Sequence, residues 1–179
     1  MSRATDEERL RGVVNGHYRL AWRLIRRLGV VSADAEDAVQ QVFIVVARRL
    51  STIEAGSERA FVVSTAVRVA ADARRLSRRK PLELLAHIDE VEGAFAAPDE
   101  LTEARRARRV LDELLDSMPG DVRGVFVLFE IEELTLTEIA AVLEIPRGTA
   151  ASRLARARVW FSEAVESRRG VATGKGQRP

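Results

Sequence analysis

Apolar residues recur along most of this chain at steps of three and four residues, the spacing that lines one face of an α-helix. The first such stretch ends at Gly29, and two more follow before residue 80, on either side of the polar stretch from 50 to 59. Asp34 stands where the second helix needs an N-cap. The pattern predicts a three-helix unit. Its apolar positions are Leu10, Val13, Val14, Tyr18, Ala21, Leu24, Ile25 and Leu28, then Ala35, Ala38, Val39, Val42, Val46 and Leu50, then Val62, Thr65, Ala66, Val69, Ala73 and Leu76.

A second helical unit is predicted after an acidic interval that contains two prolines and lacks a clear period. A helix that ends at Pro119 and Gly120 carries Val110, Leu111, Leu114, Leu115 and Met118, and the next one carries Val122, Val125, Phe126 and Phe129. From Arg168 onwards no apolar period remains, so we expect a disordered tail. The predicted fold class is all-α, with two small helical domains joined by a flexible linker. The boundaries are 1–80 and 105–167 for the domains, 81–104 for the linker and 168–179 for the tail.

The stretch from 134 to 161, LTLTEIAAVLEIPRGTAASRLARARVWF, predicts a helix-turn-helix. Thr135 and Glu138 have the spacing of a capping box, in which a threonine and a glutamate bond the first amides of a helix. A narrow apolar face of Leu136, Ile139, Ala140 and Leu143 lasts barely two turns. Pro146 suits the first position of a second helix, so only a tight turn separates the two.

The second helix of this pair has two distinct faces when about 100° is taken per residue. Ala150, Leu154, Ala157 and Phe161 cluster on the side expected to face the core. The opposite side carries Ser152, Ala155, Arg156 and Val159, with Ala151 beside it and Arg153 at the flank. Small side chains let a helix enter the major groove, and arginine bonds guanine edges or phosphate. An arginine-rich face is equally compatible with a solvated surface, and periodicity alone does not decide between these two interpretations.

The charge distribution divides the chain in the same places as the helical pattern. Apolar residues make up 46% and charged residues 31%, a globular balance, and the net charge is only +2. Residues 1–80 carry 16 Lys and Arg against 9 Asp and Glu, whereas 81–104 carry 7 acidic residues and no Lys or Arg. Residues 105–179 carry 13 basic residues against 11 acidic ones. An acidic connector therefore lies between a basic unit and a nearly balanced one.

Several classes of protein are disfavoured by what the sequence lacks. With no cysteine, neither disulfides nor thiolate metal sites can form. His17 and His87 are the two histidines, neither stands in a metal-ligand or triad spacing, and there is no phosphate-binding glycine loop. We therefore expect no enzyme, and no catalytic residue, cofactor or metal. No run is long enough to span a bilayer, and the first residues lack the apolar core of a signal peptide, so we expect a cytoplasmic protein without membrane insertion.

Two segments resemble one protein family. LTEIAAVLEIPRGTAASRLARAR resembles the region 4 helix-turn-helix of bacterial RNA polymerase sigma factors of the extracytoplasmic-function (ECF) group. DAEDAVQQVFIVVARRL and ERAFVVSTAVRVAADARRLSRR resemble consecutive helices of that group's region 2. Together these similarities cover roughly residues 17–80 and 110–166. Two motifs in the family's order are more specific than either alone.

The resemblance implies an alternative sigma factor that binds core RNA polymerase and recognises the −10 and −35 promoter elements. The expected partners are the clamp helices of the largest polymerase subunit, the flap region of the second-largest, promoter DNA that is double-stranded at −35 and single-stranded at −10, and an anti-sigma factor. The implied polymerase-binding positions are Glu36, Asp37, Gln40 and Phe43. An acidic first helical turn that complements the helix dipole, with Phe43 in the core, is the alternative interpretation of the same residues.

The resemblance also implies positions that contact DNA. For −10 they are Phe61, Arg68, Asp72, Arg74, Arg75, Arg78 and Arg79, with a base-reading pocket in the loop from 51 to 57. For −35 they are Arg147, Thr149, Ala151, Ser152, Arg153, Ala155 and Arg156, of which Arg147 and Arg153 would contact phosphate. The last arginines of the −10 set could instead complement the end of their own helix.

The sequence departs from the family pattern at several of these positions. Phe61 replaces a usual tryptophan, Arg68 a frequent asparagine, and Ala151 and Ala155 replace larger side chains. Glu144 stands at a turn position often filled by glycine, and a positive φ there would imply strain. A conventional helix-turn-helix regulator that acts without polymerase remains the alternative function, although it would leave the region 2 similarity unexplained.

Overall fold

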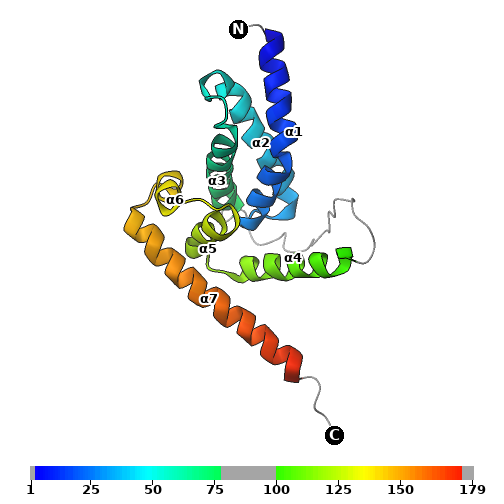
Figure 1. Ribbon diagram of the computed structural model, residues 1–179, viewed down its shortest axis with the longest axis vertical. Coiled ribbons are helices and arrows are strands. Elements are labelled where there is room, and N and C mark those ends of the chain that lie inside the picture. Colours follow the sequence, from blue (N-terminus) through cyan, green and yellow to red (C-terminus); the bar gives the residue numbers. More distant parts are fainter. Residues whose placement is uncertain (1–2, 78–99, 175–179) are drawn as a thin grey trace. The chain divides into compact units, whose positions relative to one another are not determined.

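The computed structural model describes residues 3–77 and 100–174, and throughout these ranges the regular elements are helical. The chain divides into two compact units, Met1–Val91 and Glu92–Pro179. Figure 1 labels the helices of each unit. None of the described helices has the length and apolar character needed to cross a bilayer.

The first unit packs three helices around an aliphatic core. They are α1 (Arg3–Arg27), α2 (Ser32–Arg49) and α3 (Glu58–Ser77), and the short 3-10 helix η1 (Leu50–Thr52) follows α2. Apolar side chains at helical spacing turn inwards from each of them, and burial of each stabilises the unit by roughly 1.5–3 kcal/mol. The fully buried residues include Leu24, Ile25, Val39, Val42, Val62, Val63 and Ala66.

The end of α1 is set by Gly29, as the sequence predicts. Gly29 has φ +88°, a left-handed conformation that glycine adopts without steric cost. Its amide donates to the carbonyl of Arg26 at 2.9 Å, and the amide of Val30 donates to that of Ile25 at 3.3 Å. These two bonds form a Schellman motif, which satisfies the last carbonyls of the helix and turns the chain towards α2.

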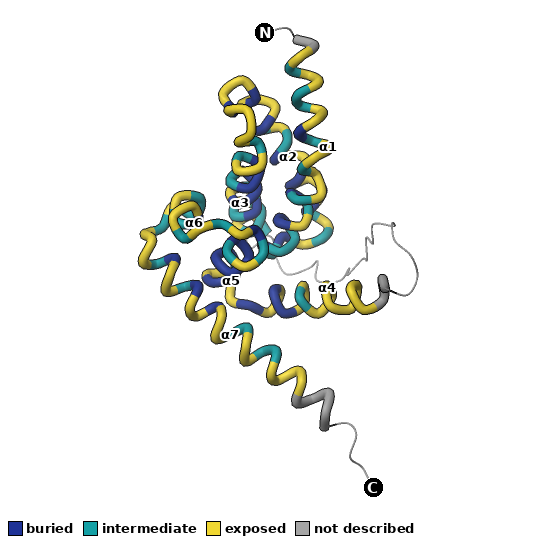
Figure 2. Tube along the Cα trace, in the orientation of Figure 1, coloured by how far each residue is buried: buried dark blue, intermediate teal, exposed yellow. Residues whose placement is uncertain are grey.

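The second unit contains α4 (Glu100–Ser117), α5 (Gly120–Phe126), the π-helical turn η2 (Val127–Ile131), α6 (Leu136–Leu143) and α7 (Arg147–Gly174). Its core lies where α5 and α6 pack against α7 and where η2 packs against α5 and α6, and Figure 2 shows the buried segments. Phe126 of α5 stacks on Phe161 of α7 with ring centroids 4.9 Å apart. The most buried residues there include Leu115, Val125, Val127, Leu128, Ile139, Ala150 and Ala157.

Several predicted core positions turn out to be exposed or only partly buried, and four of them stand out. Tyr18 is 41% exposed, Leu76 is exposed next to the last residue of α3, and Val110 is exposed in the middle of α4. Phe129 is half-buried, whereas Val127 and Leu128 are buried instead. The π-helical turn explains this last difference, because the amide of Glu132 bonds the carbonyl of Val127 five residues back and so shifts the helical register.

Several predicted boundaries also differ from the observed ones. The second helix begins at Ser32, so Asp34 lies inside its first turn, and the N-cap residue Val31 makes no side-chain cap. Helix α4 begins at Glu100, within the predicted linker, because leucine, glutamate, alanine and arginine there all favour a helix. Helix α7 continues to Gly174, past the predicted start of the tail, since a formed helix gains one hydrogen bond per added residue. The remainder of the predicted linker and tail lies outside the described residues.

Candidate nucleic-acid interface

The helix-turn-helix has the predicted form. Thr135 caps α6: its hydroxyl oxygen accepts from the amide of Glu138, and the Glu138 carboxylate accepts from the Thr135 amide at 2.8 Å. The hydrogen bonds from the hydroxyl and amide of Thr135 lower the pKa of Glu138 below its ordinary value of 4.5. A Schellman turn at Glu144 ends α6, and α7 starts at Arg147, one residue after the expected Pro146.

The turn between α6 and α7 places a non-glycine residue in left-handed backbone. Glu144 has φ 55° and ψ 44°. This is the positive φ that, according to the sequence analysis, would imply strain at this position. Its amide donates to Ala141 at 3.4 Å, and the amide of Ile145 donates to Ala140 at 3.0 Å. The motif therefore forms as it would with glycine, at the steric cost of a Cβ in left-handed backbone.

The two faces of α7 are those expected from the sequence. Ala150, Leu154 and Ala157 are buried and Phe161 is half-buried. The opposite side is exposed at Ala151, Ser152, Ala155, Arg156 and Val159, and Arg147 is exposed too, whereas Thr149 and Arg153 are half-buried. We call Ala151, Ser152, Ala155 and Arg156 the outer face of α7.

Polar contacts also join α7 to the rest of its unit. Arg158 donates from Nε to the Glu130 carboxylate at 2.7 Å, and its guanidinium lies 5.1 Å from the centre of the Phe129 ring. On the outer face, Nη1 of Arg156 donates to Oδ2 of Asp121 at 3.2 Å. The Ser152 hydroxyl donates to the Thr149 carbonyl. Asp121 is not among the residues predicted from the sequence, because no local pattern links it to a residue 35 positions later.

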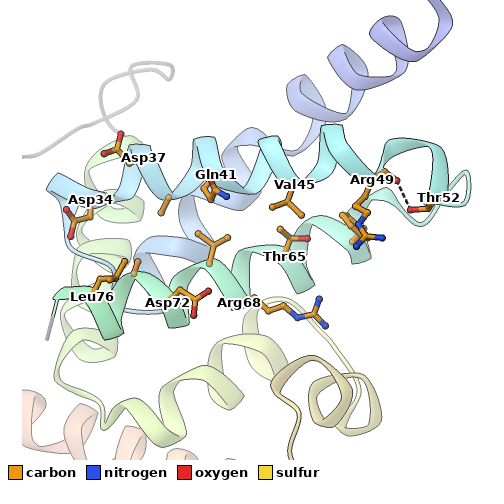
Figure 3. Close-up of a pocket in the computed structure, with 14 residues that line it drawn as sticks. Asp34, Asp37, Gln41, Val45, Arg49, Thr52, Thr65, Arg68, Asp72 and Leu76 are labelled. Carbon is orange, nitrogen blue, oxygen red and sulfur yellow. Dashed lines mark hydrogen bonds between the residues drawn. The ribbon is translucent and has the colours of Figure 1, made fainter. Parts of the chain in front are cut away.

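A groove of about 880 Å³ runs between α2 and α3 in the first unit (Figure 3). Three of the residues implied for −10 line it: Phe61, Arg68 and Asp72. Asp34 and Leu76 lie at one end, and Arg49 and Thr52 at the other, beside the loop that follows α2. The groove is therefore acidic at one end and basic at the other. Arg49 and Thr52 were not among the predicted residues, although they border the predicted base-reading loop.

Of the remaining arginines of the −10 set, the two that the structure describes lie on different sides of α3. Arg75 is exposed and pairs with Asp72 at 3.4 Å, whereas Arg74 is half-buried and lies on a different side of α3. Arg78 and Arg79 lie outside the described residues. Within the described part of the set, Phe61, Arg68 and Asp72 therefore line the groove, Arg75 contacts it through Asp72, and Arg74 is not among its lining residues.

Arg9 of α1 forms hydrogen bonds with the loop between α2 and α3. The guanidinium of Arg9 donates to the carbonyls of Leu50 and Ile53, at 3.1 and 2.7 Å, and to the Glu58 carboxylate at 2.7 Å. The contact with Arg9 is the main cause that lowers the pKa of Glu58 below its ordinary 4.5. Gly56 in this loop has φ +89°. The loop that the sequence describes only as polar is thus anchored at both ends.

The four residues implied for polymerase binding are all at least partly exposed, but they do not all lie on the same side of α2. Glu36, Asp37 and Gln40 are exposed and Phe43 is half-buried. Asp37 lines the groove between α2 and α3. Phe43 instead stacks on Tyr18 of α1, with ring centroids 6.2 Å apart, and shares its side of α2 with Glu36 and Gln40. Tyr18, assigned to the core from its spacing, is thus the exposed member of an aromatic pair.

Comparisons with known families agree with both halves of the chain. Residues 13–80 match Sigma-70 region 2, and residues 108–160 match Sigma-70, region 4. The chain is 31% identical over 147 residues to the ECF RNA polymerase sigma factor SigE of Mycolicibacterium smegmatis. It is 32% identical over 128 residues to the ferric citrate uptake sigma factor FecI of Escherichia coli, and 29% identical over 150 residues to the ECF sigma-E factor of that organism.

The extent of these matches differs among the relatives. The matched segment covers 82% of this chain for SigE, 69% for FecI and 78% for sigma-E. The matches span 57% of the mycobacterial relative, 72% of FecI and 75% of sigma-E.

Solved structures of similar fold come from complexes. CnrH in complex with the cytosolic domain of CnrY has a TM-score of 0.62 at 20% identity, over 90% of both chains. The sigma factor RpoE of Bartonella quintana, in complex with the anti-sigma factor NepR, has a TM-score of 0.64 at 18% identity, over 86% of this chain and 94% of that one. At these identities the likeness concerns the fold.

Proposed function

Because the chain belongs to the ECF sigma factors of RNA polymerase, we propose that it binds core polymerase and directs promoter-specific transcription initiation through both of its helical units. The observation that carries the proposal is the presence of region 2 and region 4 in one chain, in the family's order. A conventional helix-turn-helix regulator accounts for region 4 but leaves region 2 without a role. We assign region 2 to residues 1–80, a linker to 81–104, region 4 to 105–167 and a tail to the residues beyond, in a cytoplasmic protein.

The outer face of α7 reads the −35 element in this proposal. It is exposed along the whole stretch where a recognition helix contacts base edges, and three of its four side chains are small enough for close approach to the major groove. Arg156 supplies the donors that recognise guanine bidentately. The exposed Arg147 and half-buried Arg153 contact phosphates, which fixes the register without reading sequence.

The basic end of the α2–α3 groove holds unpaired bases of the −10 element. Phe61 offers an aromatic surface on which a base can stack, and Arg49 and Arg68 offer hydrogen-bond donors. The Thr52 hydroxyl, which donates to the Arg49 carbonyl, offers an acceptor. Asp34 and Asp37 repel phosphate from the other end. This polarity directs the strand towards the loop from 51 to 57, which Arg9 holds in one conformation. Asp72 then accepts from a base amino group rather than contacting the backbone.

Polymerase docks through two separate surfaces. On region 2, Glu36, Gln40 and Phe43 form one stripe of α2, and Asp37 extends it towards the groove. The clamp helices of the largest subunit are the partner for this stripe, and the flap region of the second-largest subunit is the partner for region 4. An anti-sigma factor that covers such surfaces would keep the protein inactive. The complexes of CnrH with CnrY and of RpoE with NepR support this last partner.

Run-off transcription with purified core polymerase tests the proposal on a library of promoter fragments. We expect specific initiation only when the chain is present, lost on Asp37→Ala because docking fails, and lost on Arg156→Ala because −35 recognition fails. Copurification with core polymerase should be reduced by the first substitution and retained by the second. Binding of duplex DNA without any binding of core polymerase would favour the conventional regulator.

A further inference from the structure

A single ion pair joins the outer face of α7 to the start of α5. Nη1 of Arg156 lies 3.2 Å from Oδ2 of Asp121, and both side chains are largely exposed, at 65% and 46%. The contact uses one terminal nitrogen of the guanidinium. The edge formed by Nε and Nη2 remains geometrically suited to two parallel hydrogen bonds with another group.

Asp121 is held in place by its neighbours. Val122 beside it is buried, and the amides of Val122 and Arg123 both donate to the Pro119 carbonyl, at 3.1 and 2.9 Å. The Arg123 guanidinium donates to the Met118 carbonyl at 3.0 Å and pairs with Asp116 at 3.5 Å. Burial of this guanidinium lowers the pKa of Arg123, which stays charged. The Asp121 carboxylate thus projects from a fixed turn.

Arg156, by contrast, has little else on its own face to support it. Ala151, Ser152 and Ala155 are too short to brace a guanidinium, and Ser152 directs its hydroxyl to the Thr149 carbonyl of its own helix. The backbone of Arg156 is rigid, since Leu154 and Ala157 on either side are buried. The contact with Asp121 therefore restricts the rotamers of a long and otherwise adaptable side chain.

We propose that Asp121 is a positioning residue that determines specificity, because it holds the Arg156 guanidinium so that the Nε and Nη2 edge meets O6 and N7 of a guanine in the −35 element. This proposal rests on the proposed function, since it requires that α7 reads the −35 element. Asp121 lies outside the helix-turn-helix, and in this proposal it contributes to recognition of the −35 element.

The test uses holoenzyme assembled from core polymerase and the full chain. A promoter library with a randomised −35 segment first identifies the preferred guanine, and duplexes with adenine or 7-deazaguanine at that position then measure discrimination. For Asp121→Ala we expect the preference for guanine over both substitutes to fall roughly tenfold, as for loss of one well-oriented bidentate contact. Affinity for the substituted duplexes and the salt dependence of binding should stay nearly unchanged, because no phosphate contact is lost.

Three variants distinguish positioning from a general structural effect. Asp121→Asn keeps an acceptor oxygen and should restore part of the preference. Glu130→Gln disrupts the other ion pair of α7, at 2.7 Å to Arg158, and should leave the preference intact. Adding Asp121→Ala to Arg156→Ala should change the base preference no further.

Two results would overturn the positioning role. One is an unchanged base preference in Asp121→Ala while the wild type depends on the −35 element. The other is tighter binding of all duplexes by the same factor, which would mean that the carboxylate merely repels DNA. Wild-type holoenzyme that initiates without any −35 dependence would instead overturn the proposed reading of DNA by α7, and this proposal with it.

Discussion

Arg9 of α1 and Glu58 of α3 form an ion pair in which Nη2 and Oε1 lie 2.7 Å apart. Both side chains are mostly shielded, with 25% and 18% of their surface exposed. The other carboxylate oxygen of Glu58 accepts from the Gly56 amide at 2.7 Å, and Arg9 bonds two further carbonyls of the same loop. The loop that we assign to −10 recognition is thus ordered before DNA binds.

Replacing Arg9 by alanine should loosen this loop without unfolding the three-helix core. Amide hydrogen exchange between Ile53 and Ser57 should become faster on the order of tenfold, as expected from loss of charge-assisted hydrogen bonds that order the loop. Exchange in the buried middle of α2 should change little. The control is Arg11→Ala, which removes an exposed arginine from the same helix. Equal effects of the two substitutions on the loop would contradict the role of Arg9.

The stability that Glu58 contributes should be lost in acid. The Arg9 contact lowers the pKa of Glu58 in the folded state, so folding favours the ionised carboxylate. The contribution is fully present above the ordinary value of 4.5 and disappears as the pH falls through the lowered value. Urea unfolding of the wild type and of Glu58→Gln should therefore differ near neutral pH and converge in acid.

Replacing Glu144 by glycine should stabilise region 4. The left-handed conformation costs a non-glycine residue roughly 1–2 kcal/mol, and the greater freedom of glycine in the unfolded chain offsets about half of the gain. We expect a net increase of about 1 kcal/mol in the free energy of unfolding. Glu144→Ala is the matched control, because it removes the side chain and keeps the strain. Calorimetry should find the glycine variant more stable than the alanine variant, and equal stabilities would argue against backbone strain.

Local rules predicted most of the fold. The periodicity of α7, the capping box of Thr135 and Glu138, and the glycine end of α1 each depend on residues within a few positions of one another, and all three predictions are confirmed. The prediction failed where tertiary packing decides. The π-helical turn shifts the helical register, so Phe129 is only half-buried. Tyr18 has the spacing of a core residue although it is exposed.

The candidate sites were less predictable, because they combine distant segments. The resemblance to a family supplied Phe61, Arg68 and Asp72 as a group, and the structure adds Arg49 and Thr52 from across the groove. The partners of Arg9 lie more than 40 residues away in the sequence, and that of Arg156 lies 35 away. Such pairs follow from the packing of helices, and no spacing within one segment reveals them.

Phe61 provides the most direct test of the groove. If an unpaired base stacks on it, Phe61→Ala should weaken binding of holoenzyme to a single-stranded −10 oligonucleotide about tenfold or more, since one base stack contributes roughly 1–3 kcal/mol. Phe61→Trp should retain the affinity. Leu76→Ala also removes apolar surface, at the other end of the groove, and should have little effect because the acidic side chains there exclude the strand.

Binding to a duplex that carries only the −35 element reports on folding and on region 4, and all three variants should bind this duplex as tightly as the wild type does. A loss of affinity with Leu76→Ala as large as with Phe61→Ala would place the strand along the whole groove, and equal losses on both DNA fragments would indicate misfolding instead of a lost stack.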